Sequence, residues 1–253
     1  MSIGSSIISQ THPAPALSVA IVTPIYNPPE GWEITYLKSA CEVMSAMPDA
    51  WIEFIAVDDG SVRNCGELQF AYPRKYLSGF TGVRLDENGG KGAAIRAGLA
   101  RARSVHVIFT DCDFPYSAES VARVWRQLLA GSDVVCGRRG RAYYRSISLQ
   151  RRIVSRALRW INRLVLHLET PDSQCGLKGM NQKGREVLLD TKTKSFVFDI
   201  EFLIKSRDRR LQVAPVDVDL KQTTSLPNLK MKIVLRELWN LMKVVLRSLM
   251  RRR

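Results

Sequence analysis

The 253-residue sequence predicts an α/β protein in which helices flank a mainly parallel, Rossmann-like sheet. Two observations predict this class. Short apolar runs that are typical of buried strands alternate with amphipathic helical runs through the first 140 residues, an order that favours parallel strands joined by helices. Three of these strands end in polar clusters, as expected where a parallel sheet presents its carboxyl edge to a ligand. The length suits one large core, so we expect a single main domain.

The expected elements follow in a regular order. Apolar, β-branched runs bounded by polar or turn residues predict five strands, at residues 17–27, 51–61, 79–88, 105–113 and 133–139. Apolar residues at helical spacing predict three helices between them, at residues 32–47, 90–104 and 117–132. The first strand ends at Pro24, and a loop is expected around residues 64–73. Ser117 is expected to cap the third helix, with Glu119 in its first turn.

The second half of the chain has a different character. Residues 171–180 predict a polar turn that enters a strand, and residues 196–220 predict a helix followed by an edge strand. Residues 149–168 predict a helix with one basic stripe, formed by Arg152, Arg156, Arg159, Arg163 and His167. The expected organisation is a flexible leader at 1–16, a domain at 17–225 and a basic amphipathic C-terminal helix at 226–253.

The net charge of +14 is concentrated in two segments. Residues 138–168 hold nine arginines and no acid, and residues 226–253 hold eight lysines or arginines against Glu237. The positive charge of these two segments together exceeds the net charge of the whole chain, so the remainder of the chain is mildly acidic. Cationic helices with a broad apolar face suit an anionic membrane surface. In the alternative, each apolar face packs on the domain and the basic stripe is solvated.

Nucleic acid is the rival partner for such charge. We expect no nucleic-acid binding, because the sequence has neither a stacking aromatic platform nor a nucleic-acid-binding motif. The five cysteines form no CxxC pair, which favours reduced thiols. No secretory signal and no apolar run of about 18 residues is seen, so we expect a cytoplasmic protein that is peripheral at the membrane face.

Two acids, Asp111 and Asp113, end the apolar strand at 105–109. Ionised carboxylates this close repel each other, so solvent or a cation must neutralise them. Their spacing allows both to face one Mg²⁺ or Mn²⁺, which typically takes further ligands from water and phosphate. Such a metal would neutralise the charge on a departing diphosphate. The alternative is a solvated turn at the end of the strand.

Polar clusters also follow two neighbouring strands. Asp58 and Asp59 could hold the donor groups of a ribose or base, or they could form an ordinary Asp-Gly turn. Lys91 lies among three glycines of residues 88–92 at a helix start, where free backbone N–H groups and an ammonium suit a diphosphate. A glycine-rich start can also be a simple helix cap.

These motifs occur together in an order that resembles a known family. The order is "TPIYN", "VDDGS", "NGGKGAAIRAG", "TDCD", "DSQCGLKGM" and "FVFDIEFL". It resembles the family 2 inverting glycosyltransferases with the GT-A fold, and most of all the polyprenyl-phosphate sugar transferases, such as the dolichyl-phosphate glucosyltransferases and mannose synthases. The resemblance extends from about residue 17 to residue 225 and implies a GT-A fold for this region.

The resemblance implies the residues of the donor site. Lys91 would lie near the diphosphate. Asp111 and Asp113 would bind Mg²⁺ or Mn²⁺, with Asp113 counted among the catalytic residues. Four residues would line the nucleotide pocket, namely Pro24, Tyr26, Asp58 and Asp59.

The resemblance also implies an acceptor site. Arg138, Arg151 and Ser155 would bind the acceptor phosphate, and Asp172 and Gln174 would line the cleft between donor and acceptor. A likeness of the "DSQCG" segment to the glucose enzymes favours a UDP-sugar donor.

The sequence departs from the family at two positions. Pro28 follows Asn27 where the family usually has an acid, which leaves Glu30 or Glu33 to substitute. Pro115 stands where the mannose synthases have a further metal ligand, so only two side chains are expected to bind the metal.

The acceptor type follows from proton chemistry. No histidine lies in a motif, so an obvious base is missing. A phosphate monoester has a second pKa of about 6 and needs no base at neutral pH. A hydroxyl acceptor would need one, and Asp172, Asp199 and Glu201 are the candidates.

We therefore expect metal-dependent, inverting transfer of a sugar from a nucleotide-sugar to a polyprenyl phosphate at the membrane. The alternatives are a transferase that acts on a hydroxyl of a glycolipid or polysaccharide, a nucleotidyltransferase and a non-catalytic membrane-surface binding module.

Overall fold

The fold is described from a computed structural model. The described residues are 17–140, 172–195 and 197–221, together with 143, 144, 152, 155, 156, 159, 160, 170, 240, 242 and 243. The predicted leader at 1–16 lies outside them, as does most of the two predicted basic helices. The expected domain boundaries therefore remain predictions.

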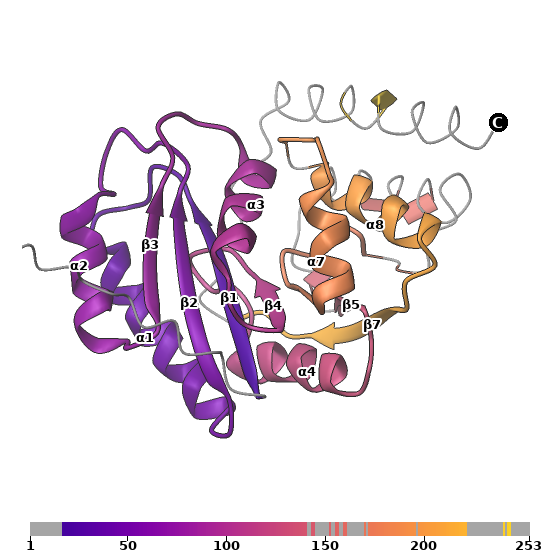
Figure 1. Ribbon diagram of the computed structural model, residues 1–253, viewed down its shortest axis with the longest axis horizontal. Coiled ribbons are helices and arrows are strands. Elements are labelled where there is room, and N and C mark those ends of the chain that lie inside the picture. Colours follow the sequence, from indigo (N-terminus) through magenta and orange to yellow (C-terminus); the bar gives the residue numbers. More distant parts are fainter. Residues whose placement is uncertain are drawn as a thin grey trace, which may run out of the picture.

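A seven-stranded sheet forms the centre of the fold (Figure 1). Its strands are β1 (Ser18–Ile25), β2 (Trp51–Asp58), β3 (Phe80–Arg84), β4 (His106–Phe109), β5 (Val134–Arg139), β6 (Lys178–Met180) and β7 (Val213–Val218). Their order is β3-β2-β1-β4-β6-β5-β7. Every neighbouring pair is parallel except those of β6, which runs antiparallel to β4 and β5. The predicted mainly parallel sheet is confirmed, and so is the edge strand at its end.

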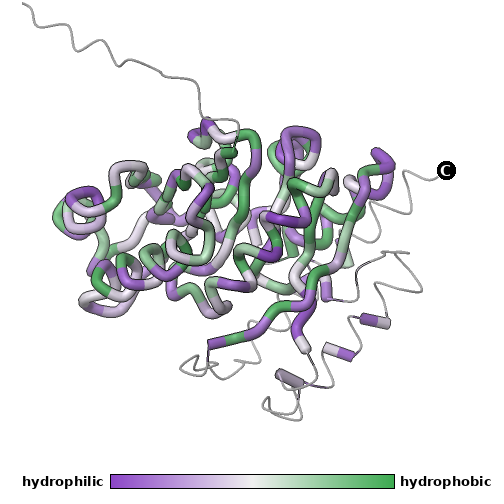
Figure 2. The backbone as a smooth tube through the Cα atoms, turned by 90° about the horizontal axis from the view of Figure 1, so that it is seen from below, coloured by the Kyte–Doolittle hydropathy of each residue, from purple (hydrophilic) through white to green (hydrophobic). Residues whose placement is uncertain are grey.

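Helices cover both faces of this sheet. They are α1 (Trp32–Ala46), α2 (Glu67–Tyr76), α3 (Lys91–Arg101), α4 (Ala118–Leu129), α7 (Gln182–Leu189) and α8 (Phe198–Asp208). One buried core contains residues of α1, α2 and α4, and the other contains residues of α3, α7 and α8. In β2, Phe54 enters the first core and Ile55 enters the second, because successive side chains of a strand point to opposite faces. Figure 2 shows short hydrophobic and hydrophilic stretches following one another along the chain.

The structure confirms the predicted cap of α4 and corrects the prediction elsewhere. The Ser117 hydroxyl accepts the Ser120 N–H, as expected. The loop expected at 64–73 is wrong, because residues 67–76 form α2 even though Pro73 lacks an N–H donor. Phe70 and Pro73 are three residues apart and both buried, and the ring centre of Phe70 lies 6.2 Å from that of Trp32. Packing against α1 therefore outweighs the weak helical signal.

Helix α7 was not among the expected elements. Its N-cap is Asn181, whose side chain accepts the Gly184 N–H. It packs against α3 and α8 over the second core. Within the described part of the chain, no helix combines the length and the apolar character that a membrane span requires.

Gly98 permits the close packing of α3 on the sheet. A Cβ atom at this position would lie 2.4 Å from Val22 Cγ1 and 3.0 Å from Val57 Cγ2. We expect Gly98→Ala to lower the free energy of unfolding by about 1–3 kcal/mol, because overpacking outweighs the higher helix propensity of alanine. Urea denaturation measures the change. Gly140→Ala is the control, since a Cβ there would contact nothing within 4 Å; equal stability of the two variants would contradict the packing argument.

Candidate active site

The polar clusters that follow β1, β2 and β4 meet at one edge of the sheet. The strands are in register there, with Ile25 beside Asp58. The Asn27 N–H donates to Ser61 Oγ at 2.8 Å, which joins the clusters after β1 and β2. The Thr110 N–H donates to the Val22 carbonyl at 3.1 Å, which places the end of β4 beside them. The predicted meeting of the three clusters is confirmed.

An ion pair joins Lys91 of α3 to Asp111 at the end of β4. The ammonium Nζ lies 2.5 Å from Asp111 Oδ1, and the side chains are 15% and 42% exposed. Burial acts to lower the pKa of Lys91, but the charges of Asp111 and Asp199 outweigh it and raise that pKa. Lys91 therefore remains a cation, and its ammonium neutralises one of the two carboxylates.

Asp113 has no such partner. No lysine, arginine or histidine of the described residues forms an ion pair with its carboxylate. Burial, followed by the charge of Asp111, raises the pKa of Asp113. Phe114 fixes the turn: it adopts a φ of 44° and is buried, with its ring centre 5.2 Å from that of Tyr36. A buried aromatic side chain thus holds the acid pair in place.

This acid pair fits a hard divalent cation. Two carboxylates lie one residue apart, and the lysine pairs with only one of them. The described residues contain no group of three or more His, Cys, Asp or Glu side chains suited to a metal. A cation here would therefore have two side-chain ligands and take the rest from water or substrate, as Mg²⁺ commonly does.

The turn before β6 packs against Asp111. A Cβ at Gly176 would lie 2.6 Å from Asp111 Oδ2, so only glycine leaves room for the carboxylate in this position. The Tyr116 hydroxyl accepts the Gly176 N–H at 3.0 Å and fixes the turn. Sequence analysis identified this turn but missed Tyr116, which lies far from it in the sequence.

The glycine-rich start of α3 differs from the expectation. Asp59 accepts the N–H groups of Gly89 and Gly90 at 2.8 and 2.9 Å, and the Gly92 N–H donates to the Lys194 carbonyl at 3.0 Å. The expectation that these amides are free for a diphosphate is therefore wrong. Burial raises the pKa of Asp59, although these two amide hydrogen bonds oppose it.

The other predicted nucleotide residues lie at the same edge. Asp58 is fully buried, accepts the Ser61 N–H at 2.9 Å and pairs with Arg84 at 2.7 Å. Tyr26 is 52% exposed directly after β1, and Pro24 lies within that strand. Asp58 thus holds the loops of the site together, and nucleotide contacts by these residues stay predictions.

Asp172 forms a buried ion pair with Arg139. Arg139 Nη2 lies 2.6 Å from Asp172 Oδ1, and Nε lies 2.7 Å from Oδ2. Burial acts to raise the pKa of Asp172, but its hydrogen bonds and charge interaction with Arg139 outweigh it and lower that pKa. The Arg139 guanidinium also lies over the Tyr143 ring, with its Cζ atom 4.4 Å from the ring centre. Sequence analysis did not identify Arg139.

The predicted acceptor residues are not all brought together. Arg138 lies beside Arg139 in sequence but pairs with Asp217 at 2.6 Å on the exposed edge formed by β5 and β7. Arg151 lies outside the described residues. Ser155 and Gln174 are half-buried. The acceptor roles of Arg138, Arg151 and Ser155 stay predictions, and Arg139 is the adjacent arginine that points toward Asp172.

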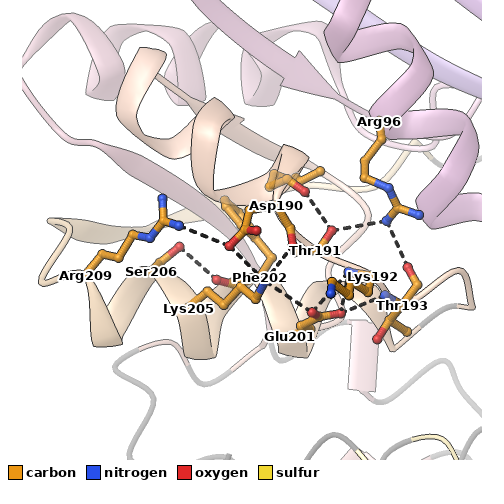
Figure 3. A network of polar contacts seen from close by, with 11 residues as sticks. Arg96, Asp190, Thr191, Lys192, Thr193, Glu201, Phe202, Lys205, Ser206 and Arg209 are labelled. Atoms are coloured by element: carbon orange, nitrogen blue, oxygen red, sulfur yellow. Dashed lines mark hydrogen bonds and ion pairs between the residues drawn. The ribbon is translucent and has the colours of Figure 1, made fainter. Parts of the chain in front are cut away.

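The remaining candidate bases are also engaged. Asp199 pairs with the fully buried Lys178 at 3.0 Å, and the Lys178 ammonium donates to the Cys175 carbonyl at 2.7 Å. Glu201 accepts the backbone N–H groups of Lys192 and Thr193 (Figure 3). Each of the three carboxylates proposed as a base, Asp172, Asp199 and Glu201, thus has a charged or hydrogen-bonding partner within the protein. They differ in that burial raises the pKa of Asp199, whose Oδ1 accepts no hydrogen bond among the described residues.

The neighbouring arginines permit a matched test. We expect Asp172→Asn to lower the free energy of unfolding by about 3–5 kcal/mol at pH 7, because it leaves the Arg139 charge buried without a partner. The exposed counterpart, Asp217→Asn, is expected to cost about 0–1 kcal/mol. Since the folded-state pKa of Asp172 is lowered, its contribution is complete above the unfolded pKa of about 4 and is lost as the pH falls through the folded value. Guanidinium denaturation at several pH values measures the free energy of unfolding of both variants. Equal losses in the two variants would contradict the conclusion that Asp172 neutralises a buried arginine.

Comparison with known proteins identifies the family. Residues 20–188, more than half of the chain, match the family described as glycosyl transferase family 2. The dolichyl-phosphate beta-glucosyltransferase of Drosophila melanogaster is 25% identical over 227 residues, which are 81% of this chain and 67% of that protein. The undecaprenyl-phosphate 4-deoxy-4-formamido-L-arabinose transferase of Salmonella choleraesuis (strain SC-B67) is 32% identical over 124 residues, 48% of this chain and 37% of that protein.

Solved structures share the fold. Glucosyl-3-phosphoglycerate synthase from Mycobacterium tuberculosis, solved with Mg²⁺ and UDP, matches with a TM-score of 0.58 at 22% identity, over 94% of this chain and 79% of that one. Mannosyl-3-phosphoglycerate synthase from Rubrobacter xylanophilus matches with a TM-score of 0.64 at 16% identity, over 93% and 74%. The sheet with its two helical layers is thus the GT-A fold that the resemblance implied. On the match to residues 20–188, the chain belongs to glycosyl transferase family 2 and is a glycosyltransferase.

Proposed function

We propose that this glycosyltransferase transfers a sugar from a nucleotide-sugar, with a UDP-sugar favoured, to a polyprenyl phosphate at a membrane surface, with inversion at the anomeric carbon. The observation that carries the proposal is the state of the candidate bases. Asp172 is bound by Arg139, Asp199 by Lys178, and Glu201 by two backbone N–H groups.

An acceptor that brings its own negative charge suits this site. A hydroxyl must lose a proton as it attacks, so it requires a base within hydrogen-bonding reach. A phosphate monoester is largely dianionic at neutral pH, because its second pKa is about 6. It requires cations that position it rather than a base. The names of the Drosophila and Salmonella relatives, both polyprenyl-phosphate sugar transferases, support the same acceptor class.

The acid pair and Lys91 suit a nucleotide diphosphate. Asp111 and Asp113 would hold Mg²⁺ or Mn²⁺, which when bound supplies positive charge that stabilises the departing diphosphate. The Lys91 ammonium, 2.5 Å from Asp111, adds a second cation at the same place. Asp59 holds the two glycines before Lys91 and so fixes the start of α3. The Mg²⁺ and UDP in the Mycobacterium structure support this assignment.

The basic segments suit a lipid acceptor. Residues 226–253 carry eight lysines or arginines against one acid and alternate them with a broad apolar face. Each basic residue near anionic lipid contributes about 1 kcal/mol of membrane affinity. We propose that this segment holds the enzyme at the cytoplasmic membrane face, where the acceptor phosphate lies.

We expect Asp113→Asn to reduce sugar transfer by about 100-fold or more, because one of the two metal ligands is lost. Transfer of radiolabelled sugar from UDP- and GDP-sugars to a short-chain polyprenyl phosphate, with and without Mn²⁺, measures the effect. Mn²⁺ binding by calorimetry should fall in parallel. The control is Asp49→Asn, an exposed turn residue after α1. Wild-type turnover by Asp113→Asn would contradict the metal role, and transfer to the free polyprenol instead of its phosphate would contradict the acceptor.

We expect removal of residues 229–253 to reduce binding to anionic vesicles, since all eight lysines and arginines of residues 226–253 are lost. Co-sedimentation with phosphatidylserine-containing and with pure phosphatidylcholine vesicles measures the binding, at low and at high salt. Removal of residues 1–16 is the matched truncation and should have no effect. Unchanged sedimentation of the C-terminal truncation would contradict the proposed role of the segment.

A further inference from the structure

Residues 191–194 lie in the connection between α7 and α8 and are fixed by side chains of two helices (Figure 3). Glu201 of α8 accepts the N–H of Lys192 at 3.1 Å and the N–H of Thr193 at 2.8 Å. Arg96 of α3 donates to Thr191 Oγ1 at 3.1 Å and to the Thr193 carbonyl at 2.9 Å. Four hydrogen-bonding groups of a short connection are thus satisfied by just two side chains, which is a strong restraint on its backbone.

The same connection is anchored at its beginning. Lys205 of α8 lies 3.0 Å from Asp190 Oδ2 and 3.6 Å from Glu201, and Arg209 lies 3.0 Å from Asp190 (Figure 3). The lysine therefore links the residue before the connection to the carboxylate that holds its middle. The hydrogen bonds and ion pairs tie segment 191–194 to α8 as well as to α3.

On its other side, segment 191–194 touches the start of α3. The Lys194 carbonyl accepts the Gly92 N–H at 3.0 Å. A Cβ at Gly90, whose φ is +83°, would lie 2.6 Å from that carbonyl and 3.7 Å from Lys194 Cβ. The Lys194 side chain thus starts beside Gly90, the residue that precedes Lys91.

The glycine amides and the Lys91 ammonium at this place already have partners within the protein. The N–H groups of Gly89, Gly90 and Gly92 are all used within the protein, so they are not available to a phosphate. The Lys91 ammonium is shared with Asp111. Lys194 is exposed, and among the described residues no acid forms an ion pair with its ammonium. A lysine carries its charge on a flexible four-carbon stem, which can extend across a neighbouring loop.

We propose that Lys194 is a phosphate-binding residue of the active site, and that Arg96 and Glu201 are positioning residues that hold it beside Lys91. This inference rests on the proposed function and adds a residue to it. The ligand is a phosphate group, which either the donor diphosphate or the acceptor phosphate can supply.

The test compares two lysines of the same segment. Lys194→Met keeps the stem and removes the charge, and Lys192→Met is the matched control, because its backbone faces Glu201 rather than the glycine loop. Calorimetry with UDP and with uridine, in the presence of Mn²⁺, measures the donor side, and the KM for a short-chain polyprenyl phosphate measures the acceptor side.

We expect Lys194→Met to weaken one of these interactions about tenfold, corresponding to about 1.4 kcal/mol. A loss for UDP but not for uridine assigns Lys194 to the donor diphosphate. A higher KM for the polyprenyl phosphate with unchanged UDP affinity assigns it to the acceptor phosphate. Wild-type values in both measurements overturn the inference, and so does an equal loss in Lys192→Met, which indicates a general charge effect.

The positioning role has its own measurement. Glu201→Ala is expected to reproduce the loss of affinity seen in Lys194→Met. The double variant is expected to bind no worse than either single variant, because Glu201 acts only by positioning Lys194. Losses that multiply overturn the positioning role. Should Glu201→Ala fail to fold, Arg96→Met replaces it in the comparison of single and double variants, because it releases the same segment from α3.

The two proposals can fail separately. A wild-type enzyme that binds neither UDP nor any nucleotide-sugar contradicts the proposed function. A wild-type enzyme that binds UDP and transfers sugar, with Lys194→Met indistinguishable from it, contradicts only the role of Lys194.

Discussion

The ion pair between Lys91 and Asp111 is the interaction on which the site depends. Parallel strands deliver acids to one edge of the sheet, where their charges would repel one another, and the ammonium at the start of α3 lowers that repulsion. Each flank of the pair is supported by a separate part of the chain. Asp59 holds the glycines before Lys91, and the turn containing Gly176 packs against Asp111. The second core, which seats α3 on the sheet, thereby also sets the position of the lysine.

Acidic residues that look alike in the sequence have different surroundings in the structure. Asp58, Asp172 and Asp199 are buried and each pairs with a cation, so they stabilise the arrangement of loops and strands. Asp113 differs because no cation of the described residues pairs with it. A carboxylate without an ion-pair partner among the described residues, beside one that is paired, is an arrangement that a divalent cation can complete. This contrast, rather than the number of acids, is the reason for proposing a metal at Asp111 and Asp113.

Much of the fold follows from the sequence, since the alternation of apolar strands and amphipathic helices extends over long segments with a clear period. The pattern failed at α2, where Pro73 resembles a helix breaker and only packing of Phe70 reveals the helix. The meeting of the strand-end motifs was predictable because parallel strands share one carboxyl edge. The residues that those motifs contact in the folded protein could not be predicted from the sequence. Asp59 with the glycine amides and Arg139 with Asp172 are contacts over 30 or more residues, and no local spacing encodes them.

The antiparallel strand β6 sits between β4 and β5, although residues 140–177 separate it from β5 in the sequence. The chain leaves the sheet at Arg139, the end of β5, and Asp172, which lies shortly before the start of β6 at Lys178, is bonded to that arginine. The ion pair therefore sets the spacing between the two ends of this stretch, in addition to the hydrogen bonds between β5 and β6.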